Sequence, residues 1–216
     1  MKILLIVAAV VLAGAGGFFF YFMKGPALSR YEYLKNPRIT TIPDTNVLEI
    51  PFATSADGLK EVFDFLFKNY FKLKGAPKRA AKMAPPLARY ENALDFEMEE
   101  EKRKTVFDNM IWKGVAAIPL PADITSLPDL RNENLTAAIA CWQYGEIAEI
   151  LHVGPYEKEA STVRKLMKFI DEQGYEVSGF HEEVYLHGPG SPFSKPEKYY
   201  TIIRYPVEKK KQLIWY

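Results

Sequence analysis

The chain repeats one pattern of apolar residues about a hundred positions apart, and this repeat constrains its fold more than any other feature of the 216-residue sequence. Apolar residues recur at helical spacing in two segments. A shift of 101 positions (160 − 59) places Leu59 on Ala160 and Leu66 on Met167. Each stripe predicts an amphipathic helix with one face against a core.

In each copy, one predicted strand precedes the helix and two follow it. A charged run at 97–104 is interpreted as the solvated tip of a hairpin. Because a helix with one apolar stripe needs a sheet to cover, the pattern predicts an α+β domain of two strand–helix–strand–strand halves related by a pseudo-twofold axis. The halves are 44–120 and 135–208, and a cleft is expected where they meet. The predicted strands are 46–52, 87–92 and 106–119, then 146–153, 181–187 and 199–207, with an additional strand at 136–141.

The N-terminal segment is long and apolar enough to cross a bilayer. Ile3 to Met23 carries no charge, and as a helix it would span roughly 31 Å, close to the hydrocarbon thickness of about 30 Å. We therefore predict one N-terminal transmembrane helix, with 1–23 as an anchor and 24–43 as a tether. A signal peptide cleaved after Ala13-Gly14-Ala15 is the alternative.

The predicted location is the cell membrane, as a single-pass protein. Lys24 and Arg30 follow the apolar segment and favour a cytoplasmic domain, whereas the short N-terminal tail favours the opposite side, so the side stays open. The segment 209–216 is interpreted as a basic tail, which would contact lipid headgroups or a partner or simply end in solvent.

Charge and cysteine content exclude several classes of function. With 28 basic and 27 acidic residues, the chain has no overall field that would attract nucleic acid. Cys141 is the single cysteine, so no internal disulfide and no cysteine-based zinc cluster is expected. His181 and His187 would lie about 20 Å apart on one strand, too far to share a metal. Neither a metal nor a cofactor is expected.

The segment 181–187 carries the candidate functional residues. In a strand, Val184 and Leu186 share one face, and Glu183 and Tyr185 share the other. We expect Val184 and Leu186 to meet the helices, which leaves Glu183 and Tyr185 facing the cleft. A carboxylate there would pair with a cationic ligand or act as a general acid or base.

The repeat adds aromatic residues to this cleft. Aligning Tyr90 with Tyr185 and Pro119 with Pro206 brings Trp112 onto Tyr199, while Ala88 stands where the second half has Glu183. One acid among rings suits a planar or cationic organic ligand. The alternative is that these are ordinary sheet aromatics and a solvated glutamate. The candidate ligand-binding residues are Glu183, Tyr185, Tyr199, Trp112 and Tyr90, and Glu183 is the candidate catalytic residue.

Several motifs of the second half resemble a known family. "HVGPY" precedes the helix, Glu183 and Tyr185 form a Glu-x-Tyr strand, and the last strand ends in "YPV". Together they resemble the GyrI-like small-molecule-binding domain, which is also the effector-binding module of some bacterial AraC-type and MerR-type regulators. The resemblance covers residues 135–208 closely and 44–120 more loosely.

The resemblance implies a tandem fold with a central cleft for lipophilic, often cationic compounds, as in multidrug binding. Some members hydrolyse cyclopropane-bearing compounds with a pocket glutamate, a role that would fall to Glu183 here with Tyr199 as its aromatic partner. Many relatives have an acid in the last strand where this chain has Ile202, so functions that need that acid are in doubt. The residues before 44 contain no helix-turn-helix segment, so a DNA-binding regulator is not expected.

Three functions follow from these observations. The preferred one is membrane-tethered binding of a small lipophilic molecule, neutral or cationic, in an aromatic cleft with a single carboxylate. The second is a hydrolase that uses Glu183, with only fold-level support. The third is a non-catalytic scaffold. Whether the protein is an enzyme stays open, and binding without catalysis is preferred.

Overall fold

The computed structural model describes residues 27–78, 82–92, 95–127, 132, 134–188 and 195–211. The predicted anchor lies outside these ranges. Among the described helices, none has the length and apolar character required to cross a bilayer.

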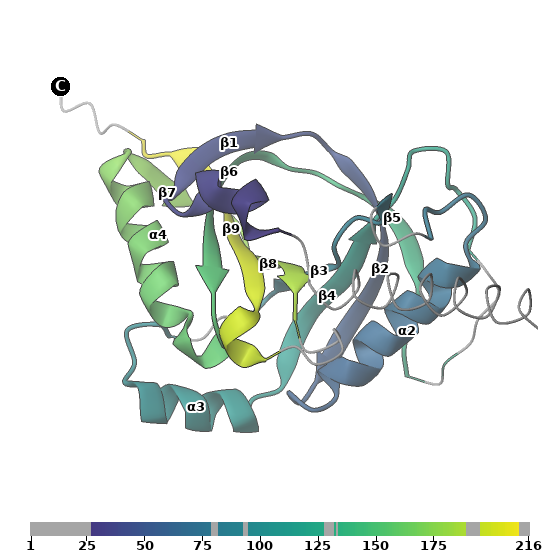
Figure 1. The fold of residues 1–216 in the computed structure, drawn as a ribbon, viewed down its shortest axis with the longest axis horizontal. Helices are drawn as coiled ribbons and strands as arrows, with labels where there is room; N and C mark the ends of the chain where they lie inside the picture. The colour runs from purple at the N-terminus through teal and green to yellow at the C-terminus, as the bar shows by residue number, and fades with distance from the viewer. Residues whose placement is uncertain are drawn as a thin grey trace, which may run out of the picture.

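An antiparallel sheet forms the centre of the molecule (Figure 1). Its strands follow the order β1-β6-β9-β8-β3-β4-β2-β5, and a short strand, β7, pairs with β9 outside this path. The strands are β1 (Arg38–Ile42), β2 (Thr45–Thr54), β3 (Leu87–Tyr90), β4 (Trp112–Pro119), β5 (Ala138–Trp142), β6 (Gly145–Val153), β7 (Tyr175–Val177), β8 (His181–His187) and β9 (Tyr200–Lys209).

The strand order confirms the duplication that the sequence predicts. In each half the last strand lies between the other two, as β2-β4-β3 and β6-β9-β8, and the halves meet at β3 and β8. The outer strands are exchanged, because β1 of the first half pairs with β6 and β5 of the second half pairs with β2. The register is repeated too: Thr45 lies opposite Trp142, and one hundred residues further on Gly145 lies opposite Ile42.

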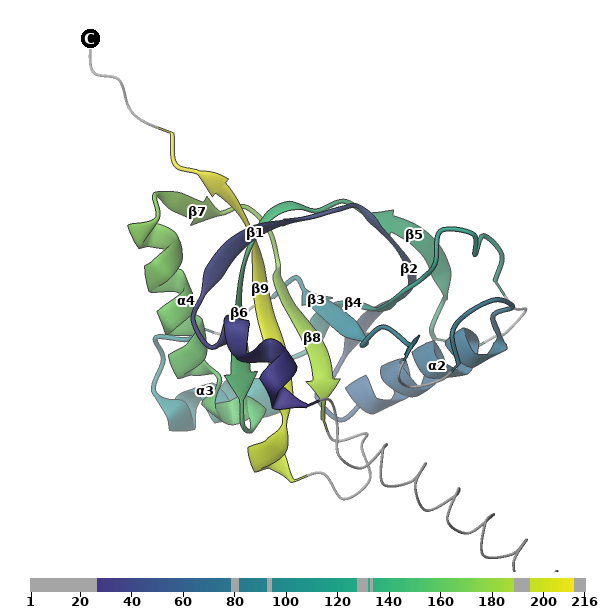
Figure 2. The same ribbon diagram turned by 45° about the horizontal axis from the view of Figure 1, so that its top comes forward.

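This exchange makes the sheet curl. β1 pairs at one end of the strand order, yet it continues through Pro43 and Asp44 into β2 near the other end. The two ends of the sheet are therefore joined by short connections, and Figure 2 shows β1, β2, β5 and β6 as an arch. The result is a curled antiparallel sheet within an α+β fold.

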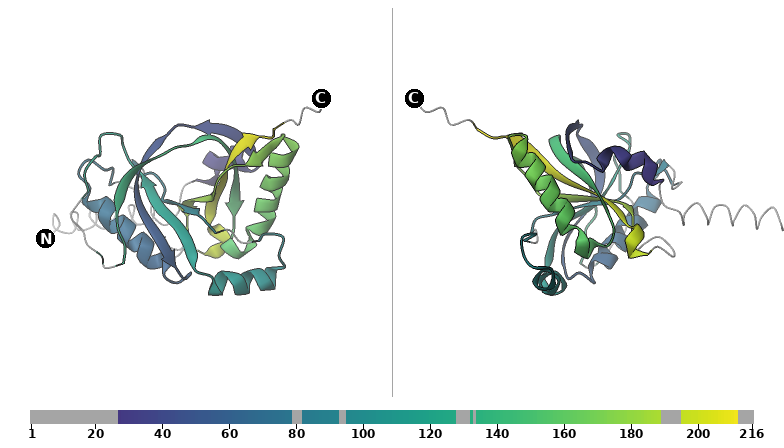
Figure 3. Two further views of the ribbon diagram at one scale, coloured as in Figure 1. Left: turned by 180° about the vertical axis from the view of Figure 1, so that it is seen from behind. Right: turned by 60° about the vertical axis from the view of Figure 1, so that its left-hand side comes forward.

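Both predicted amphipathic helices are confirmed. α2 (Leu59–Lys72) begins at Leu59 and α4 (Ala160–Glu172) at Ala160, the two positions that the repeat places on each other. α2 buries its stripe against β2 and β4, and α4 packs against β6 and β7. Both helices lie on one face of the sheet, at opposite ends (Figure 3).

The opposite face of the sheet is also covered. The 3₁₀ helix η1 (Leu28–Leu34) packs there, and Leu34 is fully buried in a cluster with Val184 and Ile202. The prediction that 24–43 is a tether is therefore wrong for most of its length, since η1 and β1 belong to the domain. β1 forms by pairing with β6, which is far away along the chain. Its five residues are too few to show the alternating pattern of a strand.

Three further predictions need correction. The charged run at 97–104 is no hairpin tip: α3 (Glu100–Asn109) forms there, with Glu100 and Glu101 favourably placed in its first turn. The strand predicted from 106 begins only at Trp112. The basic tail starts later than predicted, because Lys209 ends β9 and Lys210 forms an ion pair with Asp171 of α4.

Candidate functional site

The face of β8 that carries Glu183 is the face that the helices cover. The ring of Tyr185 lies 5.5 Å from that of Phe63 in α2, whereas Val184 packs with Leu34 on the opposite side. The prediction that Val184 and Leu186 meet the helices is therefore wrong. It assumed that only one face of the sheet is covered, but η1 fills the other. Glu183 and Tyr185 lie in the seam between α2 and α4.

Glu183 is buried at one end of a hydrogen-bonded chain that runs through His181. Its Oε1 lies 3.1 Å from His181 Nε2, and His181 Nδ1 lies 2.7 Å from the hydroxyl of Tyr205 in β9. Glu159, immediately before α4, belongs to the same cluster and is also buried. Burial, reinforced by the charge of Glu183, raises the pKa of Glu159 well above its usual value, although Arg103 opposes the shift.

Two tyrosines from the two halves meet beside this cluster. The hydroxyl oxygens of Tyr90 and Tyr185 lie 2.6 Å apart. Desolvation, followed by the nearby charge of Glu183, raises the pKa of both phenols well above its usual value. Both side chains therefore stay neutral near pH 7, and one of the two hydroxyls donates a hydrogen bond to the other.

All five predicted site residues lie on this face. Tyr90 contacts Trp112, with ring centroids 5.4 Å apart. Tyr156, in the short 3₁₀ helix η3 (Tyr156–Lys158), connects the others: its ring lies 6.1 Å from that of Tyr185 and 5.5 Å from that of Tyr199. Alternation along the strands and the repeat indicated that these residues share one face.

Four residues of the seam were missed. Tyr156 lies in the quoted "HVGPY" segment, so the sequence contained a signal for it. His181 and Tyr205 lie on the correct face of their strands, but nothing in the pattern indicates that they contact each other. Glu159 reaches the seam only because of the angle at which α4 begins, which is set by tertiary packing.

The seam is closed by α3 and the segment before it. Phe107 packs on Trp112 at 4.9 Å, Phe96 on His181 at 5.8 Å, and Arg103 donates from Nη2 to the carbonyl oxygen of Glu157 at 3.3 Å. The cavity left beside Glu159 and Tyr156 has a volume of about 50 Å³. Ligand pockets usually measure about 300–1,000 Å³. The expected open cleft is therefore filled in this structure.

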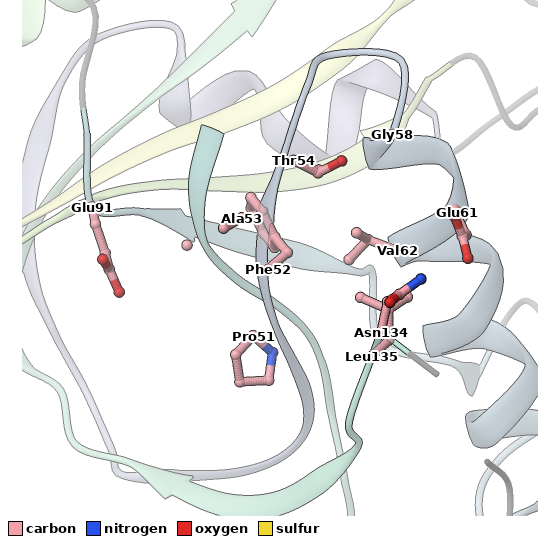
Figure 4. A pocket seen from close by; sticks show the side chains of 11 residues that line it. Pro51, Phe52, Ala53, Thr54, Gly58, Glu61, Val62, Glu91, Asn134 and Leu135 are labelled. Carbon is pink, nitrogen blue, oxygen red and sulfur yellow. The ribbon is translucent and has the colours of Figure 1, made fainter. Parts of the chain in front are cut away.

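A larger cavity of about 670 Å³ lies elsewhere, at the start of α2 beside β2 and β4 (Figure 4). It includes two carboxylates, Glu61 and Glu91, and the apolar side chains of Phe52 and Val62. None of the five predicted site residues lines it. The predicted ligand-binding residues and the larger cavity thus lie at different places in the molecule.

The other face of the sheet carries a network of charges. Glu182 accepts from Arg89 at 2.9 Å, and Glu149 accepts from Arg204 at 2.8 Å and from Arg38 at 2.6 Å. The guanidinium group of Arg89 also lies 4.0 Å from the ring of Trp142. These pairs satisfy the buried carboxylates internally, which is typical of a structural network.

Fold and seam together define a class of protein: a duplicated α+β domain with a curled antiparallel sheet, in which both halves contribute polar and aromatic residues to one seam. The family is indicated by the second half. Residues 140–208 match the family described as the GyrI-like small molecule binding domain. No curated protein sequence matches the chain.

Solved structures share this fold at low sequence identity. An uncharacterized conserved protein from Listeria innocua is 20% identical with a TM-score of 0.59, over 81% of this chain and 93% of that one. A hydrolase from Listeria innocua is 19% identical with a TM-score of 0.57, over 81% and 92%. The C-terminal domain of EcmrR is 14% identical with a TM-score of 0.54, over 81% and 98%. At these identities the likeness concerns the fold.

Proposed function

We propose that the protein is a membrane-tethered domain that binds a small lipophilic molecule, neutral or cationic, in the seam between its halves. One observation carries this proposal: aromatic side chains from both halves converge on a buried carboxylate, Glu183. Tyr90 and Trp112 come from the first half, and Tyr156 and Tyr185 from the second. The match of residues 140–208 to a small molecule binding family supports it.

The chemistry of the seam suits such a ligand. Aromatic rings offer large flat contact surfaces and attract organic cations through their faces. Glu183 would give a cationic ligand a charged partner in a site with little water, where the attraction is stronger than at the surface.

Binding requires α3 to move, because the cavity in the closed seam is too small for such a ligand. α3 is not part of the sheet. Its contacts with the rest of the domain are made mainly by Phe107 and Arg103. A ligand ring that replaces Phe107 against Trp112 would recover much of the apolar contact that the displaced helix loses. Ligand binding and displacement of α3 are therefore expected together.

Fluorescence titration of the full chain in detergent tests the proposal. Ethidium and rhodamine 6G serve as lipophilic cations and pyrene as a neutral aromatic. We expect saturable quenching of tryptophan emission that Trp112→Phe removes and that Glu183→Gln weakens at least tenfold for the cations. Glu61→Gln, in the larger cavity, is the matched control.

Two results would contradict seam binding. Loss of affinity in Glu61→Gln with no change in Glu183→Gln would move the ligand to the larger cavity. Absence of saturable binding by all three compounds would count against the binding function itself.

The membrane tether rests on the apolar sequence of residues 3–23. We expect the full chain to stay in the membrane fraction after carbonate extraction and a chain starting at residue 27 to be released. Release of the full chain, or a mature protein that lacks the segment, would favour a cleaved signal peptide instead.

Hydrolysis is the second candidate function, favoured by the hydrogen bond between His181 and Glu183. An imidazole beside a carboxylate in a closed site would activate a water molecule, and a structural neighbour is described as a hydrolase. Incubation of an electrophilic cyclopropane compound with the protein, followed by mass spectrometry, separates the two. Water addition that disappears in Glu183→Gln indicates catalysis, whereas recovery of intact compound indicates binding alone.

A further inference from the structure

Three side chains with metal-ligating atoms converge in the seam. They are Glu159, at the start of α4, and His181 and Glu183 on β8, and one ligand atom of each lies within 4.8 Å of the others. All three are buried, with exposed fractions of 7%, 5% and 8%. They come from separate parts of the second half, and the fold alone brings them together.

Among the described residues, neither carboxylate of this cluster forms an ion pair with a lysine or arginine, and the partner of Glu183 is the imidazole of His181. Glu159 Oε2 is buried and accepts no hydrogen bond from any described group. Arg103 is the nearby cation that affects Glu159, but it donates to the carbonyl oxygens of Met98 at 2.9 Å and Glu157 at 3.3 Å. A cation between two buried carboxylates that have no paired lysine or arginine would offset the cost of burying their charge.

We propose that Glu159, His181 and Glu183 bind one divalent first-row metal ion, with Zn²⁺ as the best fit. Zinc takes histidine nitrogen and carboxylate oxygen at about 2.0–2.2 Å, so neighbouring donor atoms lie roughly 3.4 Å apart in a tetrahedral site. His181 Nε2 and Glu183 Oε1 are already 3.1 Å apart. The carboxylate of Glu159, with an oxygen within 4.8 Å of both of these atoms, would complete the site by a change of its side-chain angles.

The donor set distinguishes between metals. One imidazole with two carboxylates suits zinc and its neighbours in the first row, whereas calcium requires six to eight oxygen ligands and magnesium retains most of its water. Three protein ligands leave a fourth position open, which is the arrangement of a reactive rather than a structural zinc site.

The groups around the cluster would orient its ligands through hydrogen bonds. With a metal bound, His181 would carry its proton on Nδ1 and donate it to the hydroxyl of Tyr205, 2.7 Å away, which would leave Nε2 free to bind the ion. The cavity of about 50 Å³ beside Glu159 has room for a water molecule at the open position.

Metal titration of the full chain in detergent tests this inference without any organic ligand, so its outcome is separate from that of the small-molecule proposal. After removal of metals with EDTA, we expect Zn²⁺ to bind with a stoichiometry of one in calorimetry and to raise the melting temperature. Co²⁺ should give the visible absorption of a four- or five-coordinate site, and Zn²⁺ should abolish it.

Isosteric variants assign the ligands. Glu159→Gln and His181→Gln should each weaken Zn²⁺ binding at least tenfold, whereas Glu157→Gln, two residues from Glu159 and exposed, should bind as the unaltered chain does. X-ray absorption of the zinc-loaded unaltered protein should show one imidazole and otherwise oxygen ligands. This measurement identifies the types of ligand even if the variants do not fold.

Three results would overturn the inference. One is the absence of stoichiometric binding. Another is binding that survives both variants, which would indicate an adventitious surface site. In the third, Glu159→Gln stabilises the metal-free protein and zinc does not change the stability of the unaltered protein. The cluster would then bind only protons.

Discussion

The hydroxyl oxygens of Tyr90 and Tyr185 lie 2.6 Å apart, and the two residues occupy equivalent positions in the two halves of the chain. Strands β3 and β8, which carry them, are the central antiparallel pair. The pair thus lies close to the pseudo-twofold axis, where equivalent residues of a duplicated fold meet. The tyrosine was duplicated together with its strand, and the two copies now form a hydrogen bond with each other.

This pairing predicts non-additive effects of mutation. Tyr90→Phe or Tyr185→Phe alone leaves the partner hydroxyl enclosed without its partner, which should cost about 1–3 kcal/mol. The double variant removes both hydroxyls and should be more stable than the sum of the single effects by about 1 kcal/mol. Urea unfolding of the four proteins measures this coupling. Strict additivity would show that the hydroxyls do not depend on each other.

Gly114 allows the close approach of β3 and β4. A Cβ at this position would lie 2.1 Å from the carbonyl oxygen of Arg89, which is backbone and cannot rotate away. We therefore expect Gly114→Ala to destabilise the protein by about 2–3 kcal/mol. Gly174→Ala is the control: its φ of +76° is strained for alanine but nothing lies within 4 Å, so the cost should be about 1 kcal/mol.

A smaller cost for Gly114→Ala than for Gly174→Ala, measured by urea unfolding, would mean that the sheet relaxes around the new methyl group. The pairing of β3 with β4 would then be less rigid than the structure indicates.

Glu149 holds the charge network on the face opposite the seam. Its side chain is 2% exposed and accepts from both Arg38 and Arg204. Glu149→Gln should cost roughly 2–4 kcal/mol, less than a fully buried pair because Arg38 is 44% exposed and regains water. Asp64→Asn, in an exposed pair with Lys60, should leave the urea midpoint unchanged. Equal effects of the two variants would contradict a structural role for the network.

His152 makes stability depend on pH. Its Nδ1 lies 3.0 Å from Thr162 Oγ1 and its Nε2 3.2 Å from the carbonyl oxygen of Pro155, so the neutral ring with its proton on Nε2 satisfies both contacts. Burial is the main cause that lowers the pKa of His152. Below the unfolded-state pKa of about 6.5, the unfolded chain therefore binds more protons than the folded one, and stability falls with falling pH.

We expect His152→Gln to flatten this part of the stability curve between pH 7 and 5, measured by urea unfolding at each pH. Glu32→Gln, an exposed position, is the control and should keep the slope of the unaltered protein. An unchanged slope in His152→Gln would assign the pH dependence to other groups.

Much of the architecture was predictable because its signals are local. Leu59 and Ala160 start the two helices, as the repeat predicts, and alternation along 181–187 places Glu183 with Tyr185 on one face. The periodicity of a helix or strand is set by residues a few positions apart, so it can be recognised in the sequence alone. The charged run that forms α3 was misread for the same reason: its charges indicate exposure, and an exposed helix and an exposed hairpin tip have similar compositions.

By itself the sequence determined the duplication, the two amphipathic helices and the set of residues on the face of Glu183. Only the tertiary structure decided that this face meets the helices, that β1 and β5 exchange partners, that α3 closes the seam and that Glu159 approaches His181 and Glu183. The physical reason is that a strand's alternation separates its two faces but does not say what covers either. That choice depends on η1, β1 and the start of α4, segments that are far from β8 along the chain and reach it only by folding.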